Sequence, residues 1–164
     1  MEKNKMIKAV IFDLDGVITD SAKYHYKAWK RLADKLGIPF DEEYNEKLKG
    51  VSRLESLDLI LENGPSKEFY TKEEKIAFAE EKNDYYKELI STMTPADILP
   101  GIYRFLEELK ANDIKTAIAS VSRNAFYIID RLELNDYFDY IVDASKVKNA
   151  KPHPDVFLAA AKAI

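Results

Sequence analysis

Two aspartates near the N-terminus, Asp13 and Asp15, follow directly after an apolar run at residues 9–12. A carboxylate that ends a buried strand lies at the carboxyl edge of a sheet, where open α/β sheets bind ligands. Because side chains alternate along an extended chain, both aspartates point to one side and Leu14 points into the core. Two carboxylates in one small site repel each other unless a cation lies between them or one is protonated. The spacing therefore favours a catalytic or metal-binding site over the alternative, a solvated acidic turn.

The segment around these aspartates predicts a strand followed by a helical insert. Residues 7–12 are apolar almost without interruption, which is typical of a central strand covered on both faces. Apolar residues at helical spacing predict a helix over residues 21–37. Capping boxes that begin at Ser52 and Thr71 predict two further helices. Residues 20–94 contain no convincing strand, so we interpret them as a helical cap inserted into the chain.

After Pro95 the pattern changes to alternating helices and strands. The predicted elements are a helix opened by Pro100 and Gly101, a strand at 116–119, a helix at about 125–132, a strand at 137–142 and a helix at 155–164. This order predicts an α/β fold with a parallel sheet and right-handed crossovers. The predicted organisation is a core formed by residues 1–19 and 95–164, interrupted by the cap at 20–94.

Composition restricts the class of protein. Hydrophobic residues make up 46% of the 164 residues, which is enough for a packed core, and the net charge of −4 gives no electrostatic footprint for nucleic acid. Cysteine is absent, in keeping with a reducing compartment. No apolar run reaches the roughly 20 residues of a membrane span, and Asp13 interrupts any signal-type segment. We expect a cytoplasmic protein with no nucleic acid or membrane partner.

Three motifs resemble those of the haloacid dehalogenase superfamily of phosphotransferases. Residues 12–20 resemble its first motif, Ser120 after the second predicted strand resembles its second, and Lys151, which begins the segment Lys-Pro-His-Pro-Asp at 151–155, resembles its third. The position of the helical insert resembles the small cap of one subclass. The resemblance covers essentially the whole chain and implies a parallel-sheet, Rossmann-like core with an inserted helical cap.

Further residues resemble the β-phosphoglucomutases of that superfamily. These residues lie in the cap and in the loop after the second strand, and the resemblance implies that they bind the substrate. They are His25, Trp29, Lys49, Gly50, Val51, Ser52, Arg53, Ser122, Arg123 and Asn124. The implied reaction interconverts β-glucose 1-phosphate and glucose 6-phosphate through an aspartyl-phosphate and a bisphosphate. The implied partner is a phosphorylated hexose.

The resemblance also implies roles for the residues of the core. Asp13 would be the nucleophile and would bind Mg²⁺ together with the main-chain carbonyl of Asp15, since Mg²⁺ prefers oxygen ligands. The Asp15 side chain would be the general acid and base, and Ser120 and Lys151 would cradle the transferring phosphate. Arg53 would bind the phosphate that does not react. The alternatives are a solvated surface position for Arg53 and ordinary helix packing for Trp29.

The superfamily carries a fourth motif, whose acidic residues complete the Mg²⁺ site, and no counterpart of it occurs before Ile164. We therefore expect a fragment that binds Mg²⁺ poorly, from a protein that is monomeric when complete. Two alternatives to a mutase stay open. One is a phosphatase of the same fold that acts on another small phosphate ester, and the other is a non-catalytic fragment that needs its missing segment.

Overall fold

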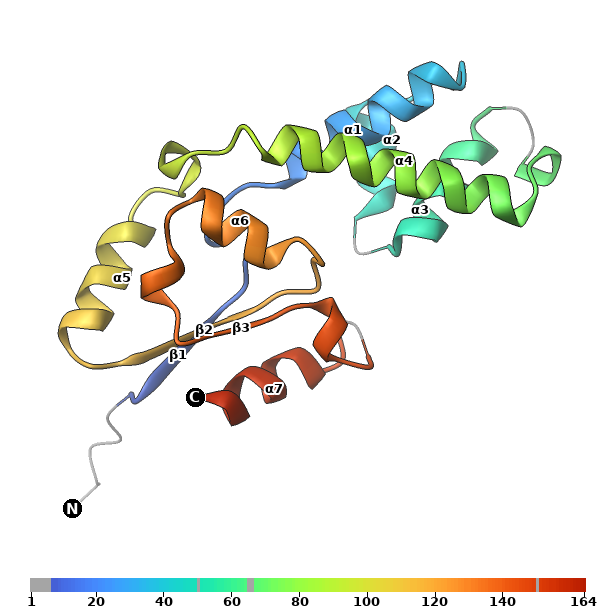
Figure 1. Cartoon of the computed structure of the whole chain (residues 1–164). Coiled ribbons are helices and arrows are strands. Elements are labelled where there is room, and N and C mark those ends of the chain that lie inside the picture. The colour runs from blue at the N-terminus through green and yellow to red at the C-terminus, as the bar shows by residue number, and fades with distance from the viewer. Residues whose placement is uncertain (1–6, 50, 65–66, 150) are drawn as a thin grey trace. The chain divides into compact units, whose positions relative to one another are not determined.

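The computed structural model describes residues 7–49, 51–64, 67–149 and 151–164 (Figure 1). The chain divides into two compact units. We call the first, Met1–Ser21 with Met93–Ile164, the sheet unit, and the second, Ala22–Thr92, the helical unit.

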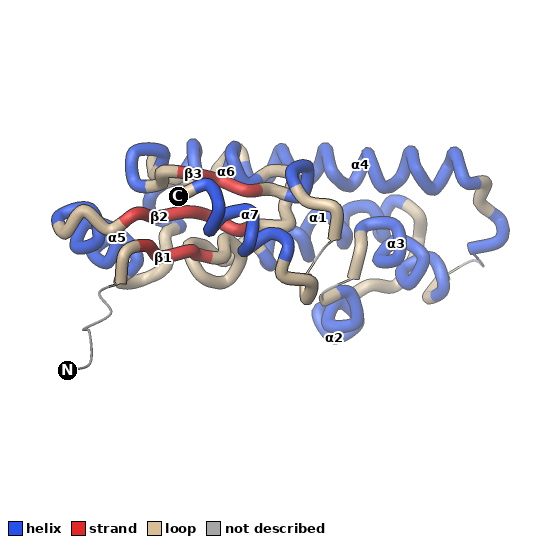
Figure 2. Tube along the Cα trace, turned by 90° about the horizontal axis from the view of Figure 1, so that it is seen from below, coloured by secondary structure: helices blue, strands red, loops and turns tan. Residues whose placement is uncertain are grey.

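The sheet unit is built on three parallel strands in the order β1-β2-β3. These strands are β1 (Ala9–Phe12), β2 (Lys115–Ala119) and β3 (Tyr140–Val142). Parallel neighbours need crossover connections, and helix α5 (Ile102–Ala111) precedes β2 while α6 (Ala125–Arg131) joins β2 to β3. Helix α7 (Asp155–Ala163) follows β3 and lies on the opposite side of the sheet from α5 and α6 (Figures 1 and 2). The predicted α/β fold class is confirmed.

Alternation along the strands divides the core of the sheet unit between the two faces. Ala117, Ala119 and Val142 pack against Val156 and Ala160 of α7. On the other face the ring of Phe12 contacts Phe105 of α5, with ring centroids 5.8 Å apart. A strand covered on both faces reads as a continuous apolar run, which explains why β1 and β2 were predictable.

The predicted strand at residues 137–142 is too long. Residues Asn135–Tyr137 form a short 3₁₀ turn, η4, and β3 begins only at Tyr140. The carbonyl groups before β3 have other partners, since Thr116 donates its hydroxyl to the carbonyl of Tyr137. The Asp139 carboxylate accepts the Thr116 amide at 2.9 Å. The Asp139 amide also donates to the Thr116 carbonyl at 2.9 Å, and the regular pairing of β2 with β3 begins at Tyr140.

The helical unit contains α1 (Ala22–Lys35), α2 (Glu42–Asn45), α3 (Arg53–Glu62) and α4 (Lys72–Ile90). Short 3₁₀ turns are η1 (Glu46–Leu48) and η2 (Lys67–Phe69), and the sheet unit adds η3 (Pro95–Asp97) and η5 (Ala144–Lys146). Both predicted capping boxes are present, at Ser52 and Thr71. Gly37 ends α1 with a φ of 68°, a conformation that glycine adopts without strain. The described residues of the helical unit contain no strand.

Buried side chains from three helices form the core of the helical unit. Leu32 of α1, with Leu57, Ile60 and Leu61 of α3, is fully buried in one cluster that also includes Ala79 of α4. None of the helices in the described part of the chain is both long enough and apolar enough to cross a membrane.

Candidate active site

The two aspartates lie in a tight loop that begins where β1 ends. Leu14 between them is fully buried, and its carbonyl accepts the amide of Ile18 at 2.9 Å. Gly16 has a φ of 76° and donates its amide to the Thr19 carbonyl at 2.8 Å. The left-handed conformation of Gly16 lets the chain turn back immediately after Asp15. The predicted burial of Leu14 is thus found, and both carboxylates stay at the sheet edge.

Asp13 is paired with Lys151, which comes from the loop before α7. The Lys151 Nζ atom lies 2.7 Å from Oδ2 of Asp13 and donates to the carbonyl of Ala119 at 3.1 Å. The other Asp13 oxygen, Oδ1, accepts the Leu14 amide at 2.7 Å. Since Ala119 ends β2, the contacts of Lys151 join the carboxyl ends of β1 and β2. The structure therefore brings Asp13 and Lys151 together.

Asp15 lies in a different environment from Asp13. Burial raises the pKa of the Asp15 carboxyl, and the negative charges of Asp13 and Asp20 raise it further. A hydrogen bond from the Ser21 hydroxyl and the positive charge of Lys151 act in the opposite direction. The net effect is a pKa above the usual value of an aspartate.

The loop after β2 presents hydroxyl groups at the same edge of the sheet. Ser120 is fully buried, its amide donates to the Val142 carbonyl at 2.9 Å, and its Oγ accepts the Ser122 amide at 3.0 Å. Ser122 Oγ in turn accepts the Asn124 amide at 3.2 Å. Each hydroxyl accepts one hydrogen bond in this loop and has one hydrogen of its own to donate. Arg123 in this loop is exposed.

Arg53, the predicted phosphate ligand, belongs to the helical unit and is the first residue of α3. Its guanidinium donates to Oδ1 of Asn83 at 3.0 Å and lies 4.0 Å from the Glu80 carboxylate. Lys49 pairs with Glu46 at 2.6 Å, and both of these side chains are largely exposed. Ser52 caps α3 and Val51 precedes it, whereas Gly50 lies outside the described residues.

A buried lysine that the motif analysis missed, Lys82, lies beside His25 and Trp29. Only 4% of Lys82 is exposed; its Nζ donates to Nδ1 of His25 at 2.9 Å and lies 4.6 Å from the Trp29 ring centroid. The His25 ring stacks on Tyr86 with centroids 4.0 Å apart. Burial and the charge of Arg53 together lower the pKa of Lys82 to about 7. Burial and the charges of Lys82 and Arg53 lower the pKa of His25 to about 3. Trp29 is 4% exposed and packs in the core.

Sequence spacing could have identified Lys82. The buried residues of α4 include Ala79, Lys82, Asn83, Tyr86 and Ile90, which follow the i, i+3, i+4, i+7, i+11 spacing of one helix face. Lys82 therefore falls on the apolar stripe of the helix, where an unpaired lysine is unusual.

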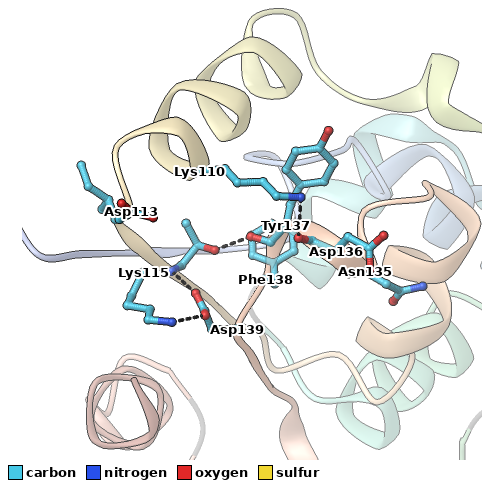
Figure 3. A pocket seen from close by; sticks show the side chains of 10 residues that line it. Lys110, Asp113, Lys115, Asn135, Asp136, Tyr137, Phe138 and Asp139 are labelled. Atoms are coloured by element: carbon cyan, nitrogen blue, oxygen red, sulfur yellow. Dashed lines mark hydrogen bonds and ion pairs between the residues drawn. The ribbon is translucent and has the colours of Figure 1, made fainter.

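A pocket of about 330 Å³ lies at the amino ends of β2 and β3, and neither Asp13 nor Asp15 lines it. Its walls come from the end of α5, the start of β2 and the segment before β3 (Figure 3). Lys115 pairs with Asp139 at 2.7 Å, and Lys110 reaches the Asp136 carbonyl at 3.4 Å (Figure 3). Both cations already have partners within the protein, so the candidate active site remains the edge that carries Asp13.

Comparison with known proteins agrees with this geometry. Residues 7–164 match the family described as haloacid dehalogenase-like hydrolase. The chain belongs to this family. It is 53% identical over 155 residues to the beta-phosphoglucomutase of Bacillus subtilis, covering 94% of this chain and 69% of that protein. It is also 34% identical to the phosphorylated carbohydrates phosphatase of Thermotoga maritima, covering 93% of this chain and 68% of that protein.

A solved structure extends the similarity to the fold. The beta-phosphoglucomutase of Clostridium difficile superimposes with a TM-score of 0.84 at 55% identity, covering 96% of this chain and 71% of that one. These relatives support an enzyme of the isomerase and phosphotransferase class, and the resemblance to the superfamily is confirmed.

Membership of the family implies a divalent metal ion. No group of three or more histidine, cysteine or acidic side chains that could hold a metal occurs among the residues described. The oxygen donors at the end of β1, the Asp13 carboxylate and the Asp15 carbonyl, nevertheless suit a hard cation chemically. The residues thus fit the predicted part of a metal site.

Proposed function

We propose that this chain carries the catalytic aspartates of a Mg²⁺-dependent phosphosugar mutase that interconverts β-glucose 1-phosphate and glucose 6-phosphate. The observation that carries the proposal is that two neighbouring carboxyls lie in different environments. Asp13 pairs with the Lys151 ammonium at 2.7 Å, while burial raises the pKa of Asp15. The 53% identity to a beta-phosphoglucomutase supports the same reaction.

Asp13 acts as the nucleophile in this proposal. One of its carboxylate oxygens forms a bond to phosphorus while the bond from phosphorus to the sugar oxygen breaks, and the product is an aspartyl-phosphate. The departing sugar oxygen takes a proton from Asp15. The Lys151 ammonium stabilises the negative charge on the phosphoryl oxygens, and the Ser120 hydroxyl can donate to them.

Asp15 then works in reverse as a general base. It accepts the proton of the free hydroxyl of a second molecule of hexose monophosphate, and that oxygen forms a bond to phosphorus while the bond from phosphorus to Asp13 breaks, which gives the bisphosphate. Transfer of the other phosphoryl group of the bisphosphate to Asp13 restores the aspartyl-phosphate and releases the isomeric monophosphate. A Mg²⁺ ion held by the Asp13 carboxylate and the Asp15 carbonyl would neutralise phosphoryl charge when bound.

A mutase must also hold the phosphate that does not react, and we assign this role to Arg53 with Ser122, Arg123 and Asn124. The Arg53 side chain is about one third exposed, and an arginine can bind a phosphate through two parallel hydrogen bonds. The proposed substrate is a phosphorylated hexose.

The second candidate is hydrolysis of another small phosphate ester, which the 34% identity to a carbohydrate phosphatase favours. Arg53→Ala in the full-length protein distinguishes the two. For a mutase we expect isomerisation to fall far more than hydrolysis of a small aryl phosphate. Arg31→Ala is the matched control, because Arg31 is an exposed arginine of the same unit that pairs with Glu88. Equal losses of both activities would contradict the mutase assignment.

A further inference from the structure

Phe157, in the first turn of α7, is an aromatic residue without a place in the sheet packing. The face of α7 that contacts the strands is formed by Val156 and Ala160, which are fully buried against Ala117, Ala119 and Val142. Phe157 is not part of this cluster, and 39% of it is exposed. A large apolar side chain at such a position contributes little to the core and is free to make a contact outside it.

That contact is with Lys151. The Lys151 Nζ atom lies 4.9 Å from the centroid of the Phe157 ring, within the range of a cation–π interaction. The same ammonium lies 2.7 Å from Asp13 Oδ2 and 3.1 Å from the Ala119 carbonyl oxygen. A carboxylate, a carbonyl dipole and a ring face therefore hold one cation together.

We propose that Phe157 is a positioning residue that holds the Lys151 ammonium against Asp13 through its ring face. Lysine places a compact charge at the end of a flexible stem, so an ammonium in a fixed place needs lateral contacts. A second carboxylate in this position would neutralise the charge. The ring attracts the cation through its quadrupole and adds no net charge, so the ammonium keeps its full charge for phosphoryl oxygens.

The positioning itself can be tested on this chain without any activity. A cation over a ring face has its neighbouring methylene protons shifted upfield by the ring current, so we expect upfield Lys151 Hε resonances in ¹H–¹³C spectra. Phe157→Leu keeps an apolar side chain of similar reach but removes the ring, and the shift should disappear. Phe157→Tyr keeps the ring and should retain the shift.

Two controls separate positioning from general damage to α7. Leu158→Ala alters the neighbouring residue, which is 62% exposed, and should leave the Lys151 resonances unchanged. Phe126→Leu removes a ring that contacts a different lysine, Lys146, also at 4.9 Å, and should likewise leave Lys151 unchanged. Lys151 resonances that do not respond to Phe157→Leu, or that respond equally to Leu158→Ala, would overturn the proposal.

The catalytic consequence rests on the proposed function and is measured separately, as hydrolysis of a small aryl phosphate by the full-length protein. We expect Phe157→Leu to lower kcat by about two- to fivefold, the equivalent of one exposed cation–π contact, with Phe157→Tyr near the unchanged rate. If the Lys151 resonances respond as expected but Lys151→Met has no effect on turnover, the proposed function fails and the positioning stands. If Lys151→Met abolishes turnover and Phe157→Leu moves neither resonance nor rate, the positioning fails alone.

Discussion

The Lys151 ammonium lies 2.7 Å from the Asp13 carboxylate, although the two residues lie far apart in the sequence. Asp13 ends the first strand, and Lys151 precedes the last helix. The carboxyl ends of parallel strands meet at one edge, which is why segments so distant in sequence supply one site. The Asp13 carboxylate is held by the Lys151 ammonium, whereas burial raises the pKa of its neighbour Asp15 above the usual value.

Replacing Lys151 tests the role of its ammonium beside Asp13. Lys151→Met removes the charge that faces the phosphoryl oxygens, and we expect kcat for phosphosugar conversion to fall about 100-fold or more, as for other groups that stabilise transition-state charge. Lys151→Arg should recover only part of the rate, because a planar guanidinium does not match a compact ammonium. Lys162→Met, an exposed lysine of α7, is the control. Comparable rates for Lys151→Met and the control would exclude a role in phosphoryl transfer.

Burial raises the pKa of Asp15, and Ser21 acts against it. Its hydroxyl donates a hydrogen bond that favours the ionised carboxylate and lowers the Asp15 pKa against the effect of burial. Ser21→Ala removes this bond, so the Asp15 pKa should rise further. The limb of the kcat profile that reports Asp15 should move to higher pH. Ser91→Ala, which removes a hydroxyl bonded to the Glu88 carbonyl in the helical unit, should leave the limb in place. A limb that stays in place or moves to lower pH in Ser21→Ala would show that Asp15 does not produce it.

The sequence predicted those features that local chemistry determines. The apolar runs of β1 and β2 and the capping boxes at Ser52 and Thr71 appear in the structure. Contacts between distant segments were not predictable in the same way. Thr116 contacts Tyr137 and Asp139 where a longer strand was expected, and the contact of Lys151 with Phe157 depends on how α7 packs. Neither contact leaves a periodic signal in the sequence.

The candidate site shows the same division. Asp13 and Ser120 come directly after strands, and Lys151 belongs to a recognisable motif. Their types and positions therefore predicted a site. Lys82 belongs to no motif, and only its helical spacing within α4 marks it as a buried position. Its partners His25 and Trp29 lie on another helix, α1, and one sequence contains no record of that pairing. The roles of these residues stay predictions.

Lys82 should make stability depend on pH in the alkaline range. Burial lowers its pKa from 10.5 to about 7 in the folded protein, so between those values the unfolded chain binds more protons than the folded one. The free energy of unfolding should therefore rise as pH increases from 7 to 10.5 and fall in the other direction, by at most about 1.4 kcal/mol per pH unit for one proton. Urea unfolding at several pH values measures this slope.

Lys82→Met removes the titrating group and should flatten that part of the profile. Lys87→Met is the control, because Lys87 lies on the same helix but is largely exposed beside Asp84. His25 contributes a separate rise between about 3 and 6.5, since burial lowers its pKa to about 3. That lower range should persist in Lys82→Met. An unchanged slope above pH 7 in Lys82→Met would show that Lys82 is not neutral in the folded protein.

Arg131 should stabilise the segment through which the chain re-enters the sheet unit. Its guanidinium donates to the carbonyl of Met93 at 3.0 Å, and Met93 is fully buried. Arg131→Met leaves this carbonyl without its donor, which should lower the free energy of unfolding by about 1–3 kcal/mol, the cost of an unsatisfied buried acceptor. Urea denaturation measures the difference, and faster proteolysis near Met93 should accompany it.

The variant Arg131→Lys separates the bond to Met93 from the other effects of removing the guanidinium. The Arg131 Nε atom is buried without a hydrogen-bond partner among the described residues, so part of the guanidinium already lacks compensation for its burial. Arg131→Lys keeps a donor for the Met93 carbonyl and removes the buried Nε, and it should be less destabilising than Arg131→Met. Arg104→Met provides the baseline, because Arg104 is 86% exposed beside Glu108 and such pairs contribute at most about 1 kcal/mol. If Arg131→Met and Arg104→Met lower stability equally, the bond to Met93 is not what holds the re-entering segment.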